Sequence, residues 1–589
     1  MIPYIGPALF GVSAIIGGFN RKLSYLALAV SSVIFAITQF IPGDYLSYFS
    51  LIAGAVWVFS GIYSLSYGEK YGKWLASLNA LTVLGMSLIL VSTNYIELVA
   101  GWEIMSIPSY AIVALNKQKR GPAFTFMAFS EFSTSLILAG SISAFVLSGK
   151  LTFDYVLLKS YVPLLLMSFG ALIKMGMSPF MLSEWLPIAH GNAPANSSAV
   201  FSATMTLMGV FLIARMILLT DPSAALVYIG IVFLIIGSLS TLFASIYGYI
   251  AENMKMLGGF STIENQAAIL NAFGLYLIVN SPVLRAFVLT TVLIFAVSHS
   301  LSKTGLFLSI GSSGRELFGE PALPTDRWVR VGTLISTLSL SGLFPTIGGL
   351  GVWMLLESFF MGAYLGGFLG IIAIIAGSII AISEGMVTGA MIKVLSFTSL
   401  FHAEKGRASK VEAGVIFGIG VCIMLLFMIS PTLMPKTFIG GVPSTLVFNG
   451  FTIESKFSGS DFGLVSPDYV ILLIAAFSIV TYAVFRKPKV RVAEQWNGGR
   501  PLTDEYTSFA YANNIRLMLK RILRTKASAN GEPLSVSDVF WNAMVSFGRG
   551  YRKLAGIVTR KFMNGSIGWY IIYMIVAFMA VIVLSFFLY

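Results

Sequence analysis

Apolar stretches recur along the whole chain, and each is about as long as a helix that crosses a membrane. At about 1.5 Å per residue, roughly 18 to 25 residues span the ~30 Å hydrocarbon core of a bilayer. The pattern therefore predicts an all-α, polytopic membrane protein with about sixteen transmembrane helices. We place these helices near residues 2–19, 22–41, 47–66, 75–92, 94–115, 122–147, 162–182, 196–218, 224–250, 257–280, 285–310, 329–356, 366–400, 412–434, 467–485 and 568–588.

The polar connections between these stretches alternate in charge. Lysine and arginine gather in every second connection, beginning with Arg21-Lys22 and including residues 117–120 and 486–489. Because strongly basic loops stay in the cytoplasm, the alternation predicts a protein of the cell membrane with its N-terminus outside. A wrong helix count would have scrambled the alternation, so it supports the predicted number of helices.

Two of the predicted helices are interrupted. Gly176 and Pro179 break the seventh helix, and Pro345 and Gly348 break the twelfth. Broken helices at membrane depth are tolerated where they line a cavity or pack on protein. Two breaks five helices apart are what an inverted repeat of five helices would give, with helices four to eight in one copy and nine to thirteen in the other. Two unrelated proline kinks are the alternative.

The repeat suggests how the chain is organised. We assign residues 1–74 to N-terminal helices, 75–220 and 221–403 to the two repeats, 404–485 to additional helices, 486–566 to a cytoplasmic segment and 567–589 to a C-terminal membrane anchor. The segment 486–566 is basic and partly amphipathic. It is therefore expected to lie either on the membrane surface or against a partner subunit.

The composition excludes several classes of function. Apolar residues make up 57% of the chain and charged residues 11%. The net charge of +13 fits basic loops that face anionic lipid, and it does not require nucleic acid as a partner. A single cysteine, Cys422, excludes an iron–sulfur cluster held by this chain alone. The three histidines lack the spacing of a zinc site, so we predict no metal or cofactor in the chain.

Ionisable residues stand at membrane depth in several predicted helices. Counted from the helix ends, Glu103 lies roughly 21 Å deep, Lys174 18 Å, Glu131 13 Å and Lys303 12 Å, with His299 one turn from Lys303. A charge at such depth costs a few kcal/mol, so it seldom occurs without a use. The alternative is a structural role, in which these residues form internal ion pairs that only join helices. Four such positions on separate helices favour a path for ions, with Glu103 and Lys174 as the leading pair.

The same residues stand in motifs that resemble a known family. Residues 101–103 (Gly-Trp-Glu), residues 184–194 after Lys174, and residues 299–303 (His-Ser-Leu-Ser-Lys) are similar to motifs of antiporter-like membrane subunits. Such subunits are shared by respiratory complex I, multisubunit sodium/proton antiporters and energy-converting membrane hydrogenases. The resemblance spans roughly residues 75–430.

Further motifs point to one branch of that family. Residues 253–255, which end in Lys255, and residues 261–265 resemble the start of the family's tenth helix. The pair Glu264-Asn265 and the tail around residues 496–509 are more similar to the branch of membrane hydrogenases and formate hydrogenlyase.

The resemblance implies a function and partners. The chain would be a subunit that moves H⁺, Na⁺ or both within a redox-driven complex. Glu103 and Lys174 would form the coupled pair of one half-channel, and Lys303 with His299 the central relay. Glu131, Lys255 and Glu264 complete this part of the candidate set. Other membrane subunits and a peripheral arm with iron–sulfur clusters, and in hydrogenases a nickel–iron centre, would be the partners.

Some family positions are occupied differently here. Residues 201–207 offer only hydroxyls where relatives often have a lysine or histidine, and Val352 stands where an acid or lysine is expected. Glu357, one turn further on, is the candidate substitute. Glu384 and Lys393 also lie in the second half, on opposite faces of their helix, so we do not expect them to pair.

Two rival interpretations stay open at the level of sequence. The first is an independent or Mrp-type cation/proton antiporter of the same fold without redox partners. The second is a structural subunit that has lost its ion path, for which Leu207 and Val352 are the best evidence.

Overall fold

The fold is almost entirely helical. The computed structural model describes residues 2–115, 120–153, 160–178, 181–182, 185–220, 226–318, 326–400, 408–437, 446–450, 452–457, 460–484, 509–523 and 539–562, with 571–572, 574–576 and 579. Within these residues, twelve helices are long and apolar enough to cross a membrane. The prediction of an all-α, multi-pass membrane protein is therefore confirmed. The chain divides into two compact units, Met1–Ile515 and Arg516–Tyr589.

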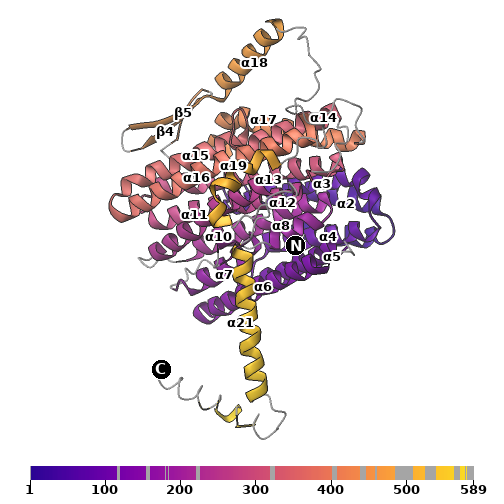
Figure 1. Cartoon of the computed structure of the whole chain (residues 1–589), viewed down its shortest axis with the longest axis vertical. Helices are drawn as coiled ribbons and strands as arrows, with labels where there is room; N and C mark the ends of the chain where they lie inside the picture. Colours follow the sequence, from indigo (N-terminus) through magenta and orange to yellow (C-terminus); the bar gives the residue numbers. More distant parts are fainter. Residues whose placement is uncertain are drawn as a thin grey trace. The chain divides into compact units, whose positions relative to one another are not determined.

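The helices of the first unit pack side by side (Figure 1). In chain order they are α1 (Ile5–Gly17), α2 (Arg21–Gln39), α3 (Ser47–Tyr67), α4 (Trp74–Val91), α5 (Tyr95–Ala114), α6 (Arg120–Ser148), α7 (Val162–Lys174), α8 (Trp185–Asn192), α9 (Ala195–Val200), α10 (Thr206–Leu219), α11 (Leu226–Ile250), α12 (Met254–Ile278), α13 (Pro282–Ser313), α14 (Arg327–Leu340), α15 (Ile347–Gly362), α16 (Gly367–Leu395), α17 (Lys410–Thr437) and α18 (Pro467–Val484).

Short elements complete the structure. The 3₁₀ turns are η1 (Ile2–Tyr4), η2 (Gly68–Lys70) and η4 (Ala363–Leu365), and the π-helical turns are η3 (Phe201–Met205) and η5 (Ser396–Leu400). Strand β1 (Met177–Ser178) pairs with β2 (Met181–Leu182), and β3 (Leu446–Asn449), β4 (Thr452–Phe457) and β5 (Ser460–Val465) form an antiparallel sheet in that order. Helix α19 (Phe509–Met518) spans the unit boundary, and the second unit holds α20 (Lys520–Leu523) and α21 (Val539–Phe562).

Polar residues fix where several of the long helices begin. The side chain of Asn94 accepts a hydrogen bond from the backbone N–H of Glu97 at the start of α5. Ser281 caps α13 in the same way, directly before Pro282, and Thr346 caps α15. Such caps satisfy backbone N–H groups that the helix itself leaves unpaired. They set the register of the helices that carry the candidate ionisable residues.

Both predicted helix breaks are confirmed. Helix α7 ends at Lys174 and the chain becomes helical again at α8, while the predicted twelfth helix is divided into α14 and α15. Gly176 and Gly342 have positive φ angles of 85° and 63°, a conformation that favours glycine. Pro345 lies in the connection between α14 and α15, and Gly348 lies in the first turn of α15. Pro179 lies outside the described residues.

The number of about sixteen spans stays a prediction, as do the five-helix repeats and the domain boundaries. Helix α12 is 25 residues long but too polar to count among the twelve apolar spans, because several buried polar side chains interrupt it. These side chains face protein and not lipid. Of the predicted last helix, near 568–588, the described residues are helical. The remainder of it lies outside the described part of the chain.

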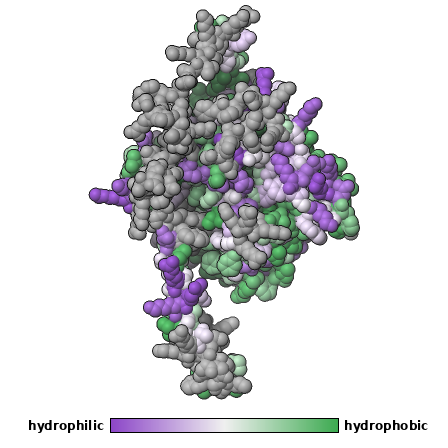
Figure 2. All heavy atoms as spheres, turned by 45° about the vertical axis from the view of Figure 1, so that its right-hand side comes forward, coloured by the Kyte–Doolittle hydropathy of each residue, from purple (hydrophilic) through white to green (hydrophobic). Residues whose placement is uncertain are grey.

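Apolar side chains gather on the outside of the molecule. The face in Figure 2 carries a broad hydrophobic area beside polar patches. On α2, for example, Leu26, Val30 and Ile37 are exposed. Many polar side chains lie inside the first unit instead, among them Lys174, Glu264 and Lys303. An apolar outer face around a partly polar interior fits helices surrounded by lipid.

The close contact of α4 with α5 gives a first prediction. A Cβ atom on Gly85 would collide with the backbone of Met105, so this contact requires glycine. We expect Gly85→Ala to lower the free energy of unfolding by about 1–3 kcal/mol, as overpacking does. Gly11, inside α1, has open space around it, and Gly11→Ala should stabilise by up to about 1 kcal/mol. Thermal unfolding in detergent measures both, and a Gly85→Ala protein of unchanged stability would contradict the packing.

Candidate ion-translocation site

Lys174 lies at the C-terminal end of α7 and is only 1% exposed. Its Nζ donates hydrogen bonds to the hydroxyls of Ser106 on α5 (2.8 Å) and Ser130 on α6 (3.0 Å). The ring of Phe126 lies 5.5 Å from the same nitrogen. The ammonium group is thus held by neutral oxygens and an aromatic face.

The predicted direct pairing of Glu103 with Lys174 is not found among the described residues, where no ion pair joins them. Glu103 stands one turn before Ser106 and is half-buried, in a groove of about 330 Å³ between α5 and α6 that also includes Ser141. Glu131 is next to Ser130 in the chain and is exposed on α6. Because each carboxylate is adjacent to a serine that holds Lys174, both remain within electrostatic range of the lysine.

The break after Lys174 is built so that its backbone groups are satisfied. The indole Nε1 of Trp185 donates to the carbonyl of Ile173 at 2.8 Å. A side chain on Gly176 would meet Ile263 at 2.7 Å, so this residue needs both the positive φ angle and the space. About one turn earlier on α7, the hydroxyl of Ser133 on α6 donates to the carbonyl of Gly170. The irregular backbone is therefore packed on protein, as the membrane requires.

A second cluster lies between α12, α13 and η3. Lys303 Nζ donates to the carbonyl of Gly258 at 3.2 Å, and His299 Nε2 lies 3.2 Å from the carbonyl of Ser202. Glu264 Oε2 accepts from the side-chain amide of Asn265 at 2.6 Å. Lys303, His299 and Glu264 are at most 1% exposed. The structure thus brings Glu264, which sequence motifs placed only at the start of a helix, into the neighbourhood of Lys303.

The hydroxyls of residues 201–207 join the turn η3 and the start of α10 to helix α12. Ser202 and Thr262 share a hydrogen bond of 2.6 Å, and Gln266 donates to Thr206 at 3.0 Å. They lie on or beside the π-helical turn η3, which faces α12 and α13. Hydroxyls at this position therefore remain polar neighbours of the His299 cluster, although they carry no charge.

Several buried polar atoms around this cluster have no hydrogen-bond partner within the described part of the chain. They are both ring nitrogens of His190, His299 Nδ1, Glu264 Oε1, Gln266 Oε1 and Ser261 Oγ. Buried polar atoms in proteins are nearly always satisfied by protein or by ordered water. This stretch of the core is polar enough to hold water between Lys303 and the two histidines.

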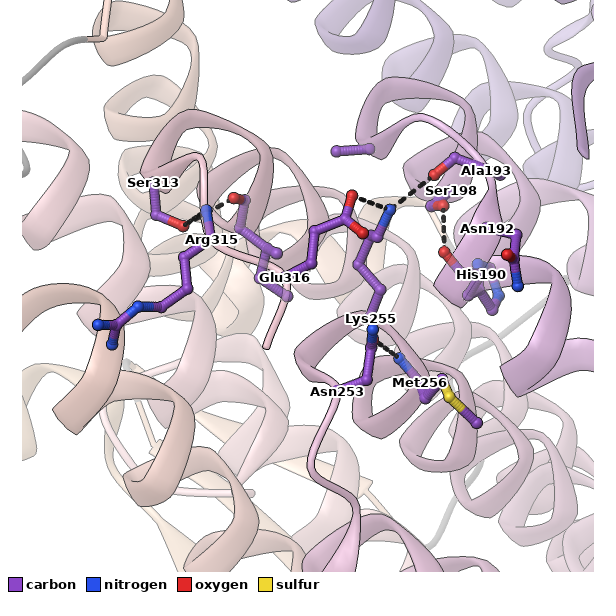
Figure 3. Close-up of polar contacts among 12 residues, drawn as sticks. His190, Asn192, Ala193, Ser198, Asn253, Lys255, Met256, Ser313, Arg315 and Glu316 are labelled. Carbon is purple, nitrogen blue, oxygen red and sulfur yellow. Dashed lines mark hydrogen bonds and ion pairs between the residues drawn. The ribbon is translucent and has the colours of Figure 1, made fainter. Parts of the chain in front are cut away.

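Lys255 is placed differently from Lys174 and Lys303 (Figure 3). Its Nζ forms an ion pair with Glu316 and donates to the carbonyl of Ala193 at 2.9 Å. Beside it, Asn253 caps α12 by accepting from the backbone N–H of Met256. Lys255 therefore joins the end of α8, the start of α12 and the segment after α13.

Lys393 plays a similar part at the end of α16. It donates to the carbonyl of Ala251 at 2.7 Å and pairs with Glu252 at 3.7 Å. No ion pair between Lys393 and Glu384 is found in the described part of the chain, and the prediction that they do not pair stays a prediction. Both Lys255 and Lys393 thus have a carboxylate at a helix end, and their predicted part in ion translocation stays a prediction.

The two acidic candidates of the second half, Glu357 and Glu384, lie in different surroundings. Glu357 on α15 is 7% exposed, and a side chain on Gly463 of β5 would collide with its carboxylate, so the sheet lies directly over it. Glu384 on α16 is half-buried and has a buried oxygen without a partner in the described residues. Val352 packs against Gly342 at the break between α14 and α15, at 2.8 Å from a Cβ placed there.

Sequence reasoning found the lysines and missed the groups that hold them. Ser106, Ser130 and Trp185 contact Lys174 or its helix, yet serines are common in membrane helices and gave no signal of their own. The only pointer was position, because Ser130 adjoins Glu131 and Ser106 follows Glu103 by one turn. Among the described residues, no group of three or more His, Cys, Asp or Glu side chains is arranged to hold a metal ion.

Comparisons with known proteins show which sequences this chain is similar to. Residues 92–375 match the family model described as NADH:quinone oxidoreductase/Mrp antiporter, transmembrane. Hydrogenase-4 component B of Escherichia coli is 26% identical over 73% of this chain and 68% of its own length. Formate hydrogenlyase subunit 3 of the same organism is 27% identical over 43% of this chain and 44% of its own length.

A solved structure matches nearly the whole fold. A chain of the membrane-bound sulfane sulfur reductase, an archaeal respiratory membrane complex, superimposes with a TM-score of 0.76. The match covers 98% of this chain and 99% of that one at 16% identity. At this identity the similarity is one of fold.

Proposed function

We propose that this chain, whose residues 92–375 belong to the NADH:quinone oxidoreductase/Mrp antiporter transmembrane family, is the antiporter-like, ion-translocating subunit of a redox-driven membrane complex. Its relatives in hydrogenase-4 and formate hydrogenlyase favour a complex of the membrane-bound hydrogenase type over a lone antiporter. Electron transfer would take place on partner subunits, including a peripheral arm that carries iron–sulfur clusters. The complex would lie in the cell membrane, with the N-terminus of this chain outside.

One contrast inside the molecule supports the proposal most directly. Four lysines are buried in the described residues: Lys174, Lys255, Lys303 and Lys393. Lys255 and Lys393 pair with carboxylates near helix ends, whereas Lys174 donates hydrogen bonds to two hydroxyls and Lys303 to a carbonyl. A carboxylate partner stabilises the charged form of a lysine, while neutral oxygens in a buried site do so much less. Lys174 and Lys303 are therefore suited to gain and lose a proton.

The surroundings supply the rest of a relay. Glu103 and Glu131 lie beside the serines that hold Lys174, and a change in their distance would load or release its proton. Unpartnered polar atoms of His190, His299 and Glu264 would allow water to lie around Lys303. Lysine relays are suited to protons. Because the family also includes subunits that move Na⁺, the proposal covers H⁺, Na⁺ or both.

A structural subunit without an ion path is the second candidate. The observation that favours it is Val352, which packs against Gly342 where a charged group would continue the path. The two candidates differ in whether removing Lys303 changes ion movement.

Purification in mild detergent tests the proposed setting. We expect iron–sulfur proteins, and nickel in a hydrogenase-type complex, to co-purify with the chain in fixed proportion. Metal analysis and electron paramagnetic resonance of the purified complex detect them. A chain that purifies alone and still exchanges cations for protons in vesicles would instead identify an independent antiporter.

A further inference from the structure

Helix α16 carries a carboxylate that the relay described above does not use. Glu384 stands roughly 26 Å from the start of α16 at Gly367 and roughly 17 Å from its end at Leu395. Its Oε2 is buried and has no hydrogen-bond partner in the described residues. A carboxylate at this depth is costly, and a structural one would be expected in an ion pair.

The neighbours of Glu384 belong to the second cluster. Helix α16 packs against α12 and α14, and Glu264 on α12 is close enough to interact with Glu384 electrostatically. Glu264 Oε1 also lacks a partner among the described residues, as does the hydroxyl of Ser383 beside Glu384. Unpaired polar atoms therefore lie on both facing helices, as in the region around His299.

Hydroxyls connect this region with Lys303 through the break between α14 and α15. Ser302, next to Lys303, donates to Ser339 on α14 at 2.7 Å. Thr388 lies one turn after Glu384, and its hydroxyl is 3.5 Å from the carbonyl of Ser341. Ser339 and Ser341 stand at the end of α14, where the helix stops. A row of polar groups thus runs from α13 across the break to α16.

The other candidates for this half are unsuited to the same task. Val352 has no ionisable group and fills the space at Gly342. Glu357 lies on the part of α15 away from the break. Its carboxylate is in contact with Gly463 of β5. Glu384 is the carboxylate that polar groups link to the Lys303 side of the break.

We propose that Glu384 is the terminal relay group of the second half, in place of the charged residue that Val352 replaces. A proton would leave the Lys303 ammonium, pass along the hydroxyls of Ser302 and Ser339 and bridging water, and bind a carboxylate oxygen of Glu384. Lys303 becomes a neutral amine and Glu384 a neutral acid, so charge is conserved. The inference rests on the proposed function, since it assumes that Lys303 exchanges protons.

The test compares Glu384→Gln with Glu412→Gln in the whole complex reconstituted into vesicles. Glu412 is the control because it is a buried glutamate on α17 outside the proposed relay, and its two oxygens accept hydrogen bonds from Ser66 and Ser312. Glutamine keeps the shape and polarity of glutamate but cannot carry the proton. We expect Glu384→Gln to lower ion translocation per electron by about tenfold or more, because a relay group is lost. Glu412→Gln should stay within about twofold of the native complex. Co-purification of the partner subunits confirms that both variants assemble.

A Lys174→Ala complex in the same assay separates this inference from the proposed function. If Lys174→Ala stops translocation and Glu384→Gln leaves it unchanged, the function stands and the role of Glu384 is refuted. An equal loss in Glu384→Gln and Glu412→Gln also refutes it, because a general effect of removing a buried acid would then explain the result. Unchanged translocation in Lys174→Ala contradicts the proposed function itself.

Discussion

Replacing Lys174 by alanine is expected to abolish ion translocation, a loss of about tenfold or more, while the complex still assembles. The ammonium is the only charged group that Ser106 and Ser130 hold at the break of α7 in the described residues. Removing it takes away the group that would exchange protons and also a buried charge without a direct ion pair. Because the desolvation cost of that charge disappears too, assembly should not suffer. Ion flux in vesicles and subunit co-purification measure the two outcomes.

Two further variants sharpen this experiment. Lys174→Arg keeps the positive charge but cannot release a proton, so it should be inactive as well. Lys22→Ala is the matched control, since Lys22 forms only an exposed pair with Glu69 and such pairs contribute little. Normal flux in Lys174→Ala would refute a role for this lysine, and normal flux in Lys174→Arg would show that charge alone is needed.

Replacing Lys303 by alanine should have a similarly large effect, about tenfold or more on the number of ions moved per electron. Lys303 is fully buried beside the residues of the His299 cluster, and its Nζ donates to the carbonyl of Gly258. If both halves of the molecule contribute, loss of the central lysine interrupts transfer between them. The measurement is proton release into vesicles against electron flow through the complex.

A neighbouring substitution provides the control for Lys303. Thr304 donates to the carbonyl of Ser300 within α13, so Thr304→Val removes one local hydrogen bond and keeps the shape of the side chain. Its effect should stay within about twofold. Unchanged coupling in Lys303→Ala would favour the structural-subunit alternative, which the replacement of a charged group by Val352 suggests.

The helix breaks and the small sheet show which local features could be predicted from the sequence. Gly176, at one predicted break, adopts a positive φ angle, and so does Gly342, which the sequence did not single out beside Pro345 and Gly348. The small sheet β3–β5 was not predicted, although Asn449-Gly450 between two short apolar-polar alternations is a strong hairpin signal. These residues lie between the predicted helices 412–434 and 467–485, where the pattern of long apolar stretches predicts no element.

The sequence by itself determined that this is a helical membrane protein and where two of its helices break, and it predicts which charges stand at membrane depth. Those properties follow from stretch length, glycine and proline chemistry, and the cost of charge in lipid, and none needs a distant residue. Only the tertiary structure decided which buried lysines have carboxylate partners. Lys174 meets Ser106 and Ser130 across 68 and 44 residues of sequence, and Lys255 meets Glu316 across 61. Helix packing brings these groups together, so their partners could not be identified from spacing along the chain.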